Sequence, residues 1–343
     1  MEFYCGIDLG SRFAQVAVID HDGRLLVQRK VRCELGAVFE LLGAFEPRPK
    51  VVIESTFNWY WLVDGLQEAG YEVHLAHVLK LAMITGSKVK TDKRDAHVLA
   101  KLLRIGAIPE AFIYPREWRA PRDLLRRRLA LVRKRAVEYG CIRRLLLRHG
   151  VLDHTRHSTT LLTSEQLAGW FDEPLVKLHA RQEVERVRLY SHQIGELEAE
   201  LLPLAVKHAD FENLQTLPGV SEILGLTLLY ETGPVTRFAS ARNYSSYCRV
   251  VSGIGQSSGV TRRRGRQSKQ GNPFLKSAYN QAATHAVRNY PKFRSLFDRQ
   301  VACHVGRVGK VVAYNTVAHK LAVATYYILR DKVSYREDLM FRD

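Results

Sequence analysis

The chain has 343 residues, of which 46% are hydrophobic and 25% charged, a composition typical of a folded protein with room for two or three domains. No apolar run approaches the ~20 residues that a membrane span needs. The five cysteines are scattered, odd in number and never spaced as Cys-x-x-Cys, which argues against a disulfide framework or a zinc ribbon. An excess of 52 Lys and Arg over 35 Asp and Glu gives a net charge of +17, which indicates a polyanionic partner. We therefore expect a cytoplasmic protein that binds nucleic acid, rather than a secreted or membrane protein.

Residues 1–115 have the pattern of an α/β domain. Residues 3–19 are apolar with interruptions, and the turn His21-Asp22-Gly23 predicts a hairpin whose second strand runs through residues 25–31. Residues 51–53 and 71–78 have the composition of buried strands, and the segment between them has helical spacing. Hairpin strands followed by alternating strands and helices predict a mixed sheet with helices packed on it.

Residues 116–208 predict a helical arm between two globular parts. In residues 116–148 basic residues far outnumber acidic ones, yet apolar residues recur at steps of three and four, which predicts a helix with one apolar seam and basic sides. That seam consists of Leu125, Leu129, Val132, Ala136 and Tyr139. A second helix has the same spacing and predicts a coiled-coil seam that ends near Pro203. The seam of the second helix consists of Val187, Tyr190, Ile194, Leu197, Leu201 and Leu204. The basic residues of the first helix that we expect to contact nucleic acid are Arg126, Arg127, Arg128, Arg133, Lys134 and Arg135.

Residues 209–343 predict a mainly α-helical part. A turn at Pro218-Gly219 leads into an apolar helix at about residues 222–230, and the chain closes with a helix at about residues 309–329. Between them, residues 252–273 are dense in Gly, Ser and Arg and predict a loop. No acidic residue occurs from residue 259 to 276, so the loop is suited to hold backbone phosphates, although a solvated charged loop has the same composition. Its basic residues are Arg262, Arg263, Arg264, Arg266 and Lys269.

The strongest chemical signal is a set of four carboxylates. Asp8 lies in the middle of an apolar strand pattern, where an ionised group is costly unless it is paired or bound to a metal. Glu54 ends the strand at residues 51–53, and Asp92 and Asp95 open a helix that runs to about residue 103. Positions 92, 95, 99 and 102 share one helix face, so both aspartates should look toward the sheet. Ribonuclease-H-like sites bind Mg²⁺ with such a set, and we therefore predict that these four residues are catalytic metal ligands.

Each of these carboxylates also has an ordinary structural explanation. Asp92 could complement a helix dipole, Asp95 could pair with a nearby cation, and Glu54 could be a plain strand-end residue. Asp8 is harder to explain in this way, because its neighbours are apolar or glycine. The segment at residues 6–11 also resembles the first phosphate loop of actin-like ATPases and sugar kinases, but the sequence lacks the second, Asp-x-Gly-Gly loop of those proteins.

The order of these motifs resembles the DEDD transposases of the IS110 family of insertion sequences, which are relatives of the Piv DNA invertases. In the first half of the chain the resemblance is carried by Asp8, Glu54 and the segment Thr91-Asp92-Lys93-Arg94-Asp95-Ala96. In the second half it is carried by Leu217-Pro218-Gly219-Val220, Arg237-Phe238-Ala239-Ser240 and Gln267-Ser268-Lys269-Gln270-Gly271-Asn272, and by the closing helix. The motifs follow one another over nearly the whole chain.

The resemblance implies a RuvC-like (ribonuclease-H-like) domain in residues 1–115, a helical coiled-coil dimerisation arm in residues 116–208 and a transposase domain with a nucleophilic serine in residues 209–343. Counting back from Ser268 places that serine at Ser257, and a shift of one residue would select Ser258. On its own a serine in such a loop is more often a turn residue, so this assignment rests on the resemblance. The resemblance also implies guidance by a structured non-coding RNA, a bridge or seek RNA.

These inferences predict a transposase or DNA recombinase of an insertion sequence that cuts and rejoins DNA through a phosphoserine intermediate, with Mg²⁺ at the DEDD site. Its expected partners are donor and target DNA, the guide RNA and further copies of the chain in a dimer or tetramer, and no membrane. The alternative enzyme is a RuvC-like metal-dependent nuclease or junction resolvase without a covalent serine intermediate. A non-catalytic nucleic-acid-binding protein is a third class, against which the intact acidic set speaks.

Overall fold

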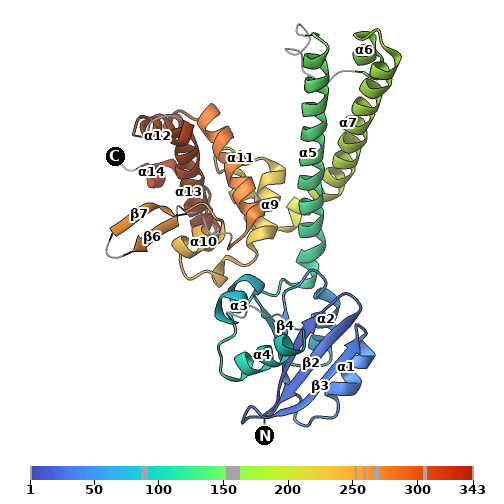
Figure 1. Ribbon diagram of the computed structural model, residues 1–343. Coiled ribbons are helices and arrows are strands. Elements are labelled where there is room, and N and C mark those ends of the chain that lie inside the picture. Colours follow the sequence, from blue (N-terminus) through green and yellow to red (C-terminus); the bar gives the residue numbers. More distant parts are fainter. Residues whose placement is uncertain are drawn as a thin grey trace. The chain divides into compact units, whose positions relative to one another are not determined.

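The structure, a computed structural model, describes residues 2–85, 92–151, 163–251, 253–257, 260–265, 270–303 and 307–341. Of residues 82–85, 92–94, 253–257, 260–265 and 307–308 it describes only the backbone. The chain divides into two compact units, residues 1–116 and 117–343, each with its own hydrophobic core (Figure 1). The expected boundary between residues 208 and 209 falls inside the second unit, so a separate arm domain stays a prediction.

The first unit is built on a five-stranded mixed sheet with the strand order β3-β2-β1-β4-β5. The strands are β1 (Tyr4–Leu9), β2 (Phe13–Ile19), β3 (Leu25–Arg32), β4 (Lys50–Glu54) and β5 (Val73–Ala76). The first three are antiparallel neighbours, whereas β1, β4 and β5 run parallel to one another. The β2–β3 pair is the hairpin predicted around residues 21–23, and β4 and β5 are the strands predicted near residues 51–53 and 71–78. The predicted mixed α/β sheet is therefore confirmed.

Helices cover both faces of this sheet (Figure 1). They are α1 (Leu35–Leu42), α2 (Tyr60–Glu68), α3 (Val78–Thr85) and α4 (Asp92–Arg104). Residues of α1 and α2 share one core with Cys5, Ile7 and Leu9 of β1, whereas residues of α3 and α4 share another core with Tyr4 and Val52. Because successive side chains of a strand point to opposite faces, α4 lies on the face to which the even-numbered residues of β1 point.

In the second unit two long helices lie side by side and antiparallel (Figure 1). They are α5 (Arg116–Arg148) and α7 (Pro174–Leu201), with the short helix α6 (Ser164–Gly169) before α7. Polar contacts join α5 to α7, among them Arg128 with Glu198, Arg135 with Ser191 and Glu138 with Arg186. We call this pair of helices the arm. From one contact to the next, the residue number on α5 increases while that on α7 decreases, as expected for two antiparallel helices.

The apolar seam predicted for α5 agrees only in part with the side of the helix that is buried. Leu125 is buried and Tyr139 packs against the buried core of the arm, but Ala136 is exposed. The buried apolar residues after Leu125 are Leu131, Ile142, Leu145 and Leu146. Leucines are frequent on two neighbouring faces of this helix, so a spacing of three and four residues could not decide which of the two faces is buried. Contact with α7 and α6 selects the face that carries Ile142 and Leu145.

The seam predicted for the second helix matches α7, where Val187, Ile194 and Leu201 are buried. α7 ends at Leu201, and a 3₁₀ helix that contains Pro203 follows it, close to the end that the proline predicts. The further expectation that the arm is a coiled coil that joins two copies of the chain stays a prediction.

The remainder of the second unit is mainly helical, and its core is formed where α9, α11 and α13 meet. Its helical elements are η2 (Leu202–Lys207), α8 (Ala209–Gln215), α9 (Glu222–Thr232), η3 (Val235–Arg237), α10 (Ala241–Tyr247), α11 (Pro273–Asn289), α12 (Pro291–Ala302), α13 (Arg307–Asp331) and α14 (Glu337–Met340). Inside the core the hydroxyl groups of Tyr244 and Tyr279 lie 2.7 Å apart, so these two buried polar groups satisfy each other. The helices predicted at residues 222–230 and 309–329 are confirmed as α9 and α13.

Part of the segment predicted as a loop, residues 252–273, forms an antiparallel hairpin instead. Its strands are β6 (Gly253–Ser257) and β7 (Val260–Gly265). Glycine is depleted in strands, and its frequency in this segment concealed the hairpin from the sequence analysis. The prediction of a loop was therefore wrong for these eleven positions.

Within the described residues, no helix combines the length and the apolar character that crossing a membrane requires. All five cysteines are free thiols, as their scattered spacing predicts.

Candidate active site and nucleic-acid interface

Asp8 and Glu54 lie on neighbouring parallel strands at the same level of the sheet. Ile7 of β1 pairs with Ile53 of β4, so Asp8 and Glu54 are the next residues along the two strands. Ile7 and Ile53 are fully buried in the core that contains α1 and α2. The side chains of Asp8 and Glu54 therefore point to the opposite face, on which α4 packs. Both carboxylates are half-buried, so a ligand from solvent can reach them.

Helix α4 approaches the sheet closely because Gly6 has no side chain. A Cβ atom at Gly6 would lie 2.6 Å from the backbone nitrogen of Ala100 and 2.8 Å from the Cβ of Leu99. The same atom would collide with the carbonyl oxygen of Ala96. Glycine at this position therefore sets the distance between α4 and the strand that carries Asp8.

The direction of α4 places its first turn toward the end of β1 at which Asp8 lies. Arg104, the last residue of α4, interacts electrostatically with Tyr4 at the start of β1, and the middle of the helix packs on the middle of the strand. The helix is therefore antiparallel to β1, and the turn with Asp92 and Asp95 lies toward Asp8. Asp95 is half-buried, and the side chain of Asp92 lies outside the described residues. The structure thus brings the two strand carboxylates and the start of α4 to one region, and their role as metal ligands stays a prediction.

The predicted nucleophile and the basic loop belong to the β6–β7 hairpin of the second unit. Ser257 is the last residue of β6 and pairs with Val260, the first residue of β7. The side chains of Ser257, Arg262, Arg263 and Arg264, and the whole of Ser258, Arg266 and Lys269, lie outside the described residues. The structure therefore places Ser257 at the closed end of a hairpin, and its role as nucleophile stays a prediction.

The segment that contains the hairpin is joined at its base, where the chain enters α11. The backbone N–H of Asn272 donates to the carbonyl oxygen of Tyr247 over 2.6 Å. The side chain of Asn272 accepts from the N–H of Phe274 over 2.9 Å and so caps α11. The hairpin therefore starts and ends on helices whose ends are bonded to each other.

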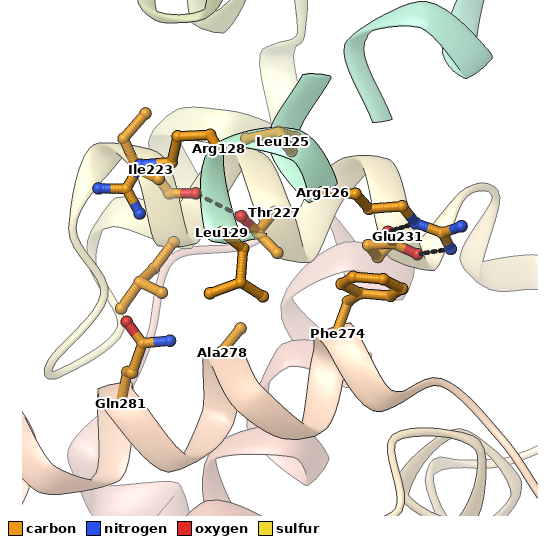
Figure 2. Close-up of a pocket in the computed structure, with 11 residues that line it drawn as sticks. Leu125, Arg126, Arg128, Leu129, Ile223, Thr227, Glu231, Phe274, Ala278 and Gln281 are labelled. Atoms are coloured by element: carbon orange, nitrogen blue, oxygen red, sulfur yellow. Dashed lines mark hydrogen bonds and ion pairs between the residues drawn. The ribbon is translucent and has the colours of Figure 1, made fainter. Parts of the chain in front are cut away.

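A buried carboxylate that the sequence analysis missed connects this base to α5. Glu231 of α9 is fully buried and accepts hydrogen bonds from Arg122 over 3.0 Å, from Asn272 over 2.7 Å and from Arg126. The Arg126 guanidinium also lies 4.3 Å from the centre of the Phe274 ring (Figure 2). Burial opposes ionisation of Glu231, but the neighbouring Arg126 and Arg122 hold the pKa of its carboxyl below its usual value. Glu231 lies in an apolar helix, and no sequence signal connects it with arginines about a hundred residues away.

The six basic residues predicted on α5 fall into two groups. Arg126, Arg128 and Arg135 bind side chains of this chain, namely Glu231, Glu198 and Ser191. These three therefore hold α5 against α9 and α7, and we leave them out of the proposed nucleic-acid interface. The other three, Arg127, Arg133 and Lys134, are exposed, and Arg133 makes one long hydrogen bond, of 3.5 Å, to the hydroxyl group of Ser277.

A second group of acidic residues lies on the arm and differs from the predicted set. Glu138 and Cys141 of α5 and Glu183 of α7 place one ligand atom each within 4.8 Å of one another. Arg186 already binds both carboxylates, with Glu138 at 3.2 Å. A thiol is also a ligand for softer metals than Mg²⁺. We interpret this group as an ion-pair cluster that stabilises the arm.

Comparison with known families agrees with the order of these sites along the chain. Residues 5–150 match a family of DEDD transposases of the IS110 type, and residues 211–298 match a family described as "Transposase IS116/IS110/IS902 family". The first match contains Asp8, Glu54, Asp92 and Asp95, and the second contains Ser257. The α/β sheet with its acidic region, followed by the helical part, therefore belongs to a transposase.

The two matches together cover more than half of the chain, and the protein belongs to the IS110 family of transposases. It is also 28% identical over 219 residues to y4qE of Sinorhizobium fredii (strain NBRC 101917 / NGR234), a protein provisionally named as a transposase. This similarity covers 64% of the present chain and 53% of the relative, so the chain spans about half the length of the relative that it matches.

Proposed function

We propose that this protein is the DNA recombinase of an insertion sequence, guided by a structured non-coding RNA, and that it cuts and rejoins DNA with Mg²⁺ at the DEDD site. The observation that carries the proposal is the convergence of Asp8, Glu54 and the first turn of α4 on one face of the sheet. A Mg²⁺ site needs several carboxylates that face one region, and this arrangement supplies them.

The donor set in this region fits Mg²⁺, which prefers carboxylate oxygens and keeps part of its water shell. The residues that would hold it are Asp8, Glu54, Asp92 and Asp95. Bound ions supply positive charge that polarises the scissile phosphate and stabilises the attacking and leaving oxygens. Asp8 and Glu54 are half-buried, so part of each side chain is accessible to a phosphate from solvent.

Ser257 is the proposed nucleophile. Its Oγ would form a bond to the scissile phosphorus, and the bond from phosphorus to one deoxyribose oxygen would break, so that this oxygen leaves as a hydroxyl group. The phosphoserine link conserves one ester bond, and attack by a deoxyribose hydroxyl on that link rejoins the DNA and restores the serine. The position of Ser257 at the closed end of a hairpin suits this role, because such a tip can enter a DNA groove.

The proposed partners are donor and target DNA, the guide RNA and further copies of the chain in a dimer or tetramer. The net charge of +17 and the exposed Arg127, Arg133 and Lys134 on α5 support contact with nucleic-acid backbones. Ser257 and the carboxylates belong to different units of the chain, so the working assembly has to bring them to the same phosphate.

The metal site is tested with Asp8→Asn, which removes one carboxylate charge and keeps the size of the side chain. We expect Mg²⁺-dependent strand cleavage to fall by at least about a hundredfold, with DNA binding unchanged. Asp22→Asn, at an exposed carboxylate in the β2–β3 turn, is the matched control and should cleave normally. Cleavage by Asp8→Asn at the control rate would refute the metal site.

The alternative function is a RuvC-like nuclease or junction resolvase, in which water attacks the phosphate. It is favoured by one observation, which is that the acidic region is built entirely within the first unit and needs no residue of the hairpin. Trapping a covalent adduct between the protein and DNA on a denaturing gel separates the two functions. An adduct supports the serine recombinase, and metal-dependent cleavage without an adduct supports the nuclease.

A further inference from the structure

The backbone of Arg249, at the base of the β6–β7 hairpin, adopts a conformation that arginine rarely takes. Its φ is +59°, in the left-handed region, and among the described residues Lys332 is the other non-glycine residue with a positive φ. Strained backbone of this kind persists where surrounding contacts enforce it, and it gathers at ligand sites. Arg249 follows α10 and precedes β6, so the strain is located where the hairpin leaves the helical core.

The side chain of Arg249 packs against Gly271, on the other end of the hairpin segment. Gly271 has φ +96°, and a Cβ atom there would lie 2.9 Å from the Cγ of Arg249. The absence of a side chain at Gly271 therefore leaves room for the arginine. Gly271 directly precedes Asn272, the N-cap of α11, so the aliphatic part of the Arg249 side chain lies beside the start of that helix.

Arg249 is also short of partners. Its Nε is buried and has no hydrogen-bond partner within the part of the chain that the structure describes. A buried N–H of a guanidinium group without an acceptor is costly, and an anion that binds there removes this cost.

A second cation lies within electrostatic range of Arg249. Lys276 follows Gly271, against which Arg249 packs, by five residues and belongs to the first turn of α11. It is half-buried, and burial together with the charge of Arg249 lowers the pKa of its amine. Two like charges held close together repel each other, so their proximity also favours an anion between them.

The amides of α11 do not provide this site. The first residue of the helix, Pro273, has no N–H, and Asn272 accepts hydrogen bonds from the N–H groups of Phe274 and Leu275 over 2.9 and 3.1 Å. An anion at this place would therefore be bound by side chains of Arg249 and Lys276 and not by the end of the helix.

We propose that Arg249 and Lys276 form a binding site for one backbone phosphate of DNA at the base of the hairpin. The inference rests on the proposed function, because it takes the strand that Ser257 would cut as the source of the phosphate. Arg249 lies eight residues before Ser257, which at about 3.3 Å per residue is a span of at most roughly 26 Å, or about eight nucleotides of one DNA strand at about 3.4 Å each. The bound phosphate thus lies within about eight nucleotides of the cut and holds the strand in register with the serine.

The test measures how strongly the full-length chain binds a fluorescent DNA duplex as the salt concentration rises. Arg249→Asn removes the charge and suits the left-handed backbone, since asparagine tolerates that region. Lys276→Met removes the second charge and keeps the aliphatic chain. Each variant should reduce the slope of log affinity against log salt by about one, because one phosphate contact and its released counterion are lost.

The matched control is Arg288→Ala, which removes an exposed cation near the other end of α11, about 18 Å from Lys276. We expect its slope to equal that of the wild type. A wild-type slope in both Arg249→Asn and Lys276→Met would overturn the proposal. A reduced slope with a single-stranded RNA probe only would also overturn it, because the phosphate would then belong to RNA.

An adduct assay on the same variants separates this proposal from the proposed function. If the wild type forms a covalent DNA adduct and both variants form it equally fast with an unchanged slope, the phosphate site is wrong and the recombinase stands. If the wild type forms no adduct but the two variants still lose one unit of slope, the phosphate site stands and the serine mechanism is wrong. Circular dichroism spectra equal to the wild type show that the variants are folded, and Lys276→Met tests the site independently of the strained residue.

Discussion

Replacing Glu231 by glutamine removes one negative charge from the interior of the second unit and keeps the shape of the side chain. Glu231 is fully buried and binds Arg122, Arg126 and Asn272, so the change leaves two guanidinium groups around a neutral amide. The side chain of Arg122 is 11% exposed and cannot regain much hydration without moving α5 away from α9. The substitution should therefore destabilise the contact between α5, α9 and the start of α11.

The expected loss follows from the burial of the three charges. Breaking a buried ion pair by removing one partner costs about 3–5 kcal/mol, and Arg126, whose side chain is 29% exposed, can turn partly to water. We therefore expect the lower end, ~3 kcal/mol. For a unit of this size the loss corresponds to a Tm lower by roughly 6–12 °C.

The assay is unfolding in urea followed by circular dichroism, with Glu198→Gln as the matched control. Glu198 pairs with Arg128 on the arm, where the two side chains are 30% and 20% exposed. Because this pair is accessible to water, its loss should cost less than about 1 kcal/mol. Equal losses for Glu231→Gln and Glu198→Gln would refute the reasoning, since burial would then make no difference to the strength of the pair.

The buried ion pair of Glu231 with Arg122 and Arg126 also predicts that stability depends on pH. The pKa of Glu231 is lowered in the folded chain from its ordinary 4.5, so its charge contributes stability above about pH 4.5, and this contribution is lost as the pH falls through the folded value. The difference in unfolding free energy between the wild type and Glu231→Gln should therefore be constant from about pH 6 to 8 and shrink below about pH 4.5. A difference that grows on acidification would contradict the assigned direction of the pKa.

Three further predictions concern the sites themselves. Gly6→Ala places a methyl group against backbone atoms of α4, so we expect a loss of at least about 2 kcal/mol in the first unit and loss of cleavage, measured by urea unfolding and a nicking assay. Ser257→Ala should abolish the covalent DNA adduct and keep DNA binding, whereas Ser258→Ala should be mild; loss in Ser258→Ala alone would shift the nucleophile by one residue. Replacing the exposed Arg133 and Lys134 by glutamine should lower the salt slope of nucleic-acid binding by about two, and an unchanged slope would remove this side of α5 from the interface.

The strands of the sheet could be predicted because their residues are apolar over several consecutive positions. The limits of single strands were less predictable, since residues 3–19 read as one apolar stretch and form the two strands β1 and β2. β2 has buried side chains on both faces, so the alternation that marks the ends of a half-exposed strand is missing. The helix α1 was missed as well, because its eight residues are too few to show a period.

The sequence suggested the acidic residues as a set, and the structure brings Asp8, Glu54 and the first turn of α4 to one region, while their role as metal ligands stays a prediction. What the sequence could not predict is which basic residues on α5 face water. Arg126 and Arg127 are adjacent, yet Arg126 binds a carboxylate 105 residues away and Arg127 is exposed. Which residue a charged side chain pairs with depends on the tertiary fold, so the sequence of α5 alone cannot predict that Arg126 pairs with Glu231.

The contacts at the base of the β6–β7 hairpin could not be predicted from the sequence either. Gly271 is explained by its positive φ and by the close approach of Arg249, but neither is visible in a segment that simply reads as rich in glycine and serine. The composition predicted a loop, and it gave no sign of the hydrogen bond from Asn272 to Tyr247 that joins the two ends of the segment. A hydrogen bond between residues that lie 25 positions apart does not affect the pattern of apolar and polar residues around either of them, so the sequence cannot reveal it.

The polar contacts along the arm have a consequence for how such a protein can change in evolution. Arg128 with Glu198, Arg135 with Ser191 and Glu138 with Arg186 follow one another along the two helices in an antiparallel register. An insertion in α5 alone, between Arg128 and Glu138, would break the register of these partners. Helical turns can therefore be added or lost within this stretch only in equal numbers in the two helices, and relatives that differ in its length should show paired insertions or deletions in α5 and α7.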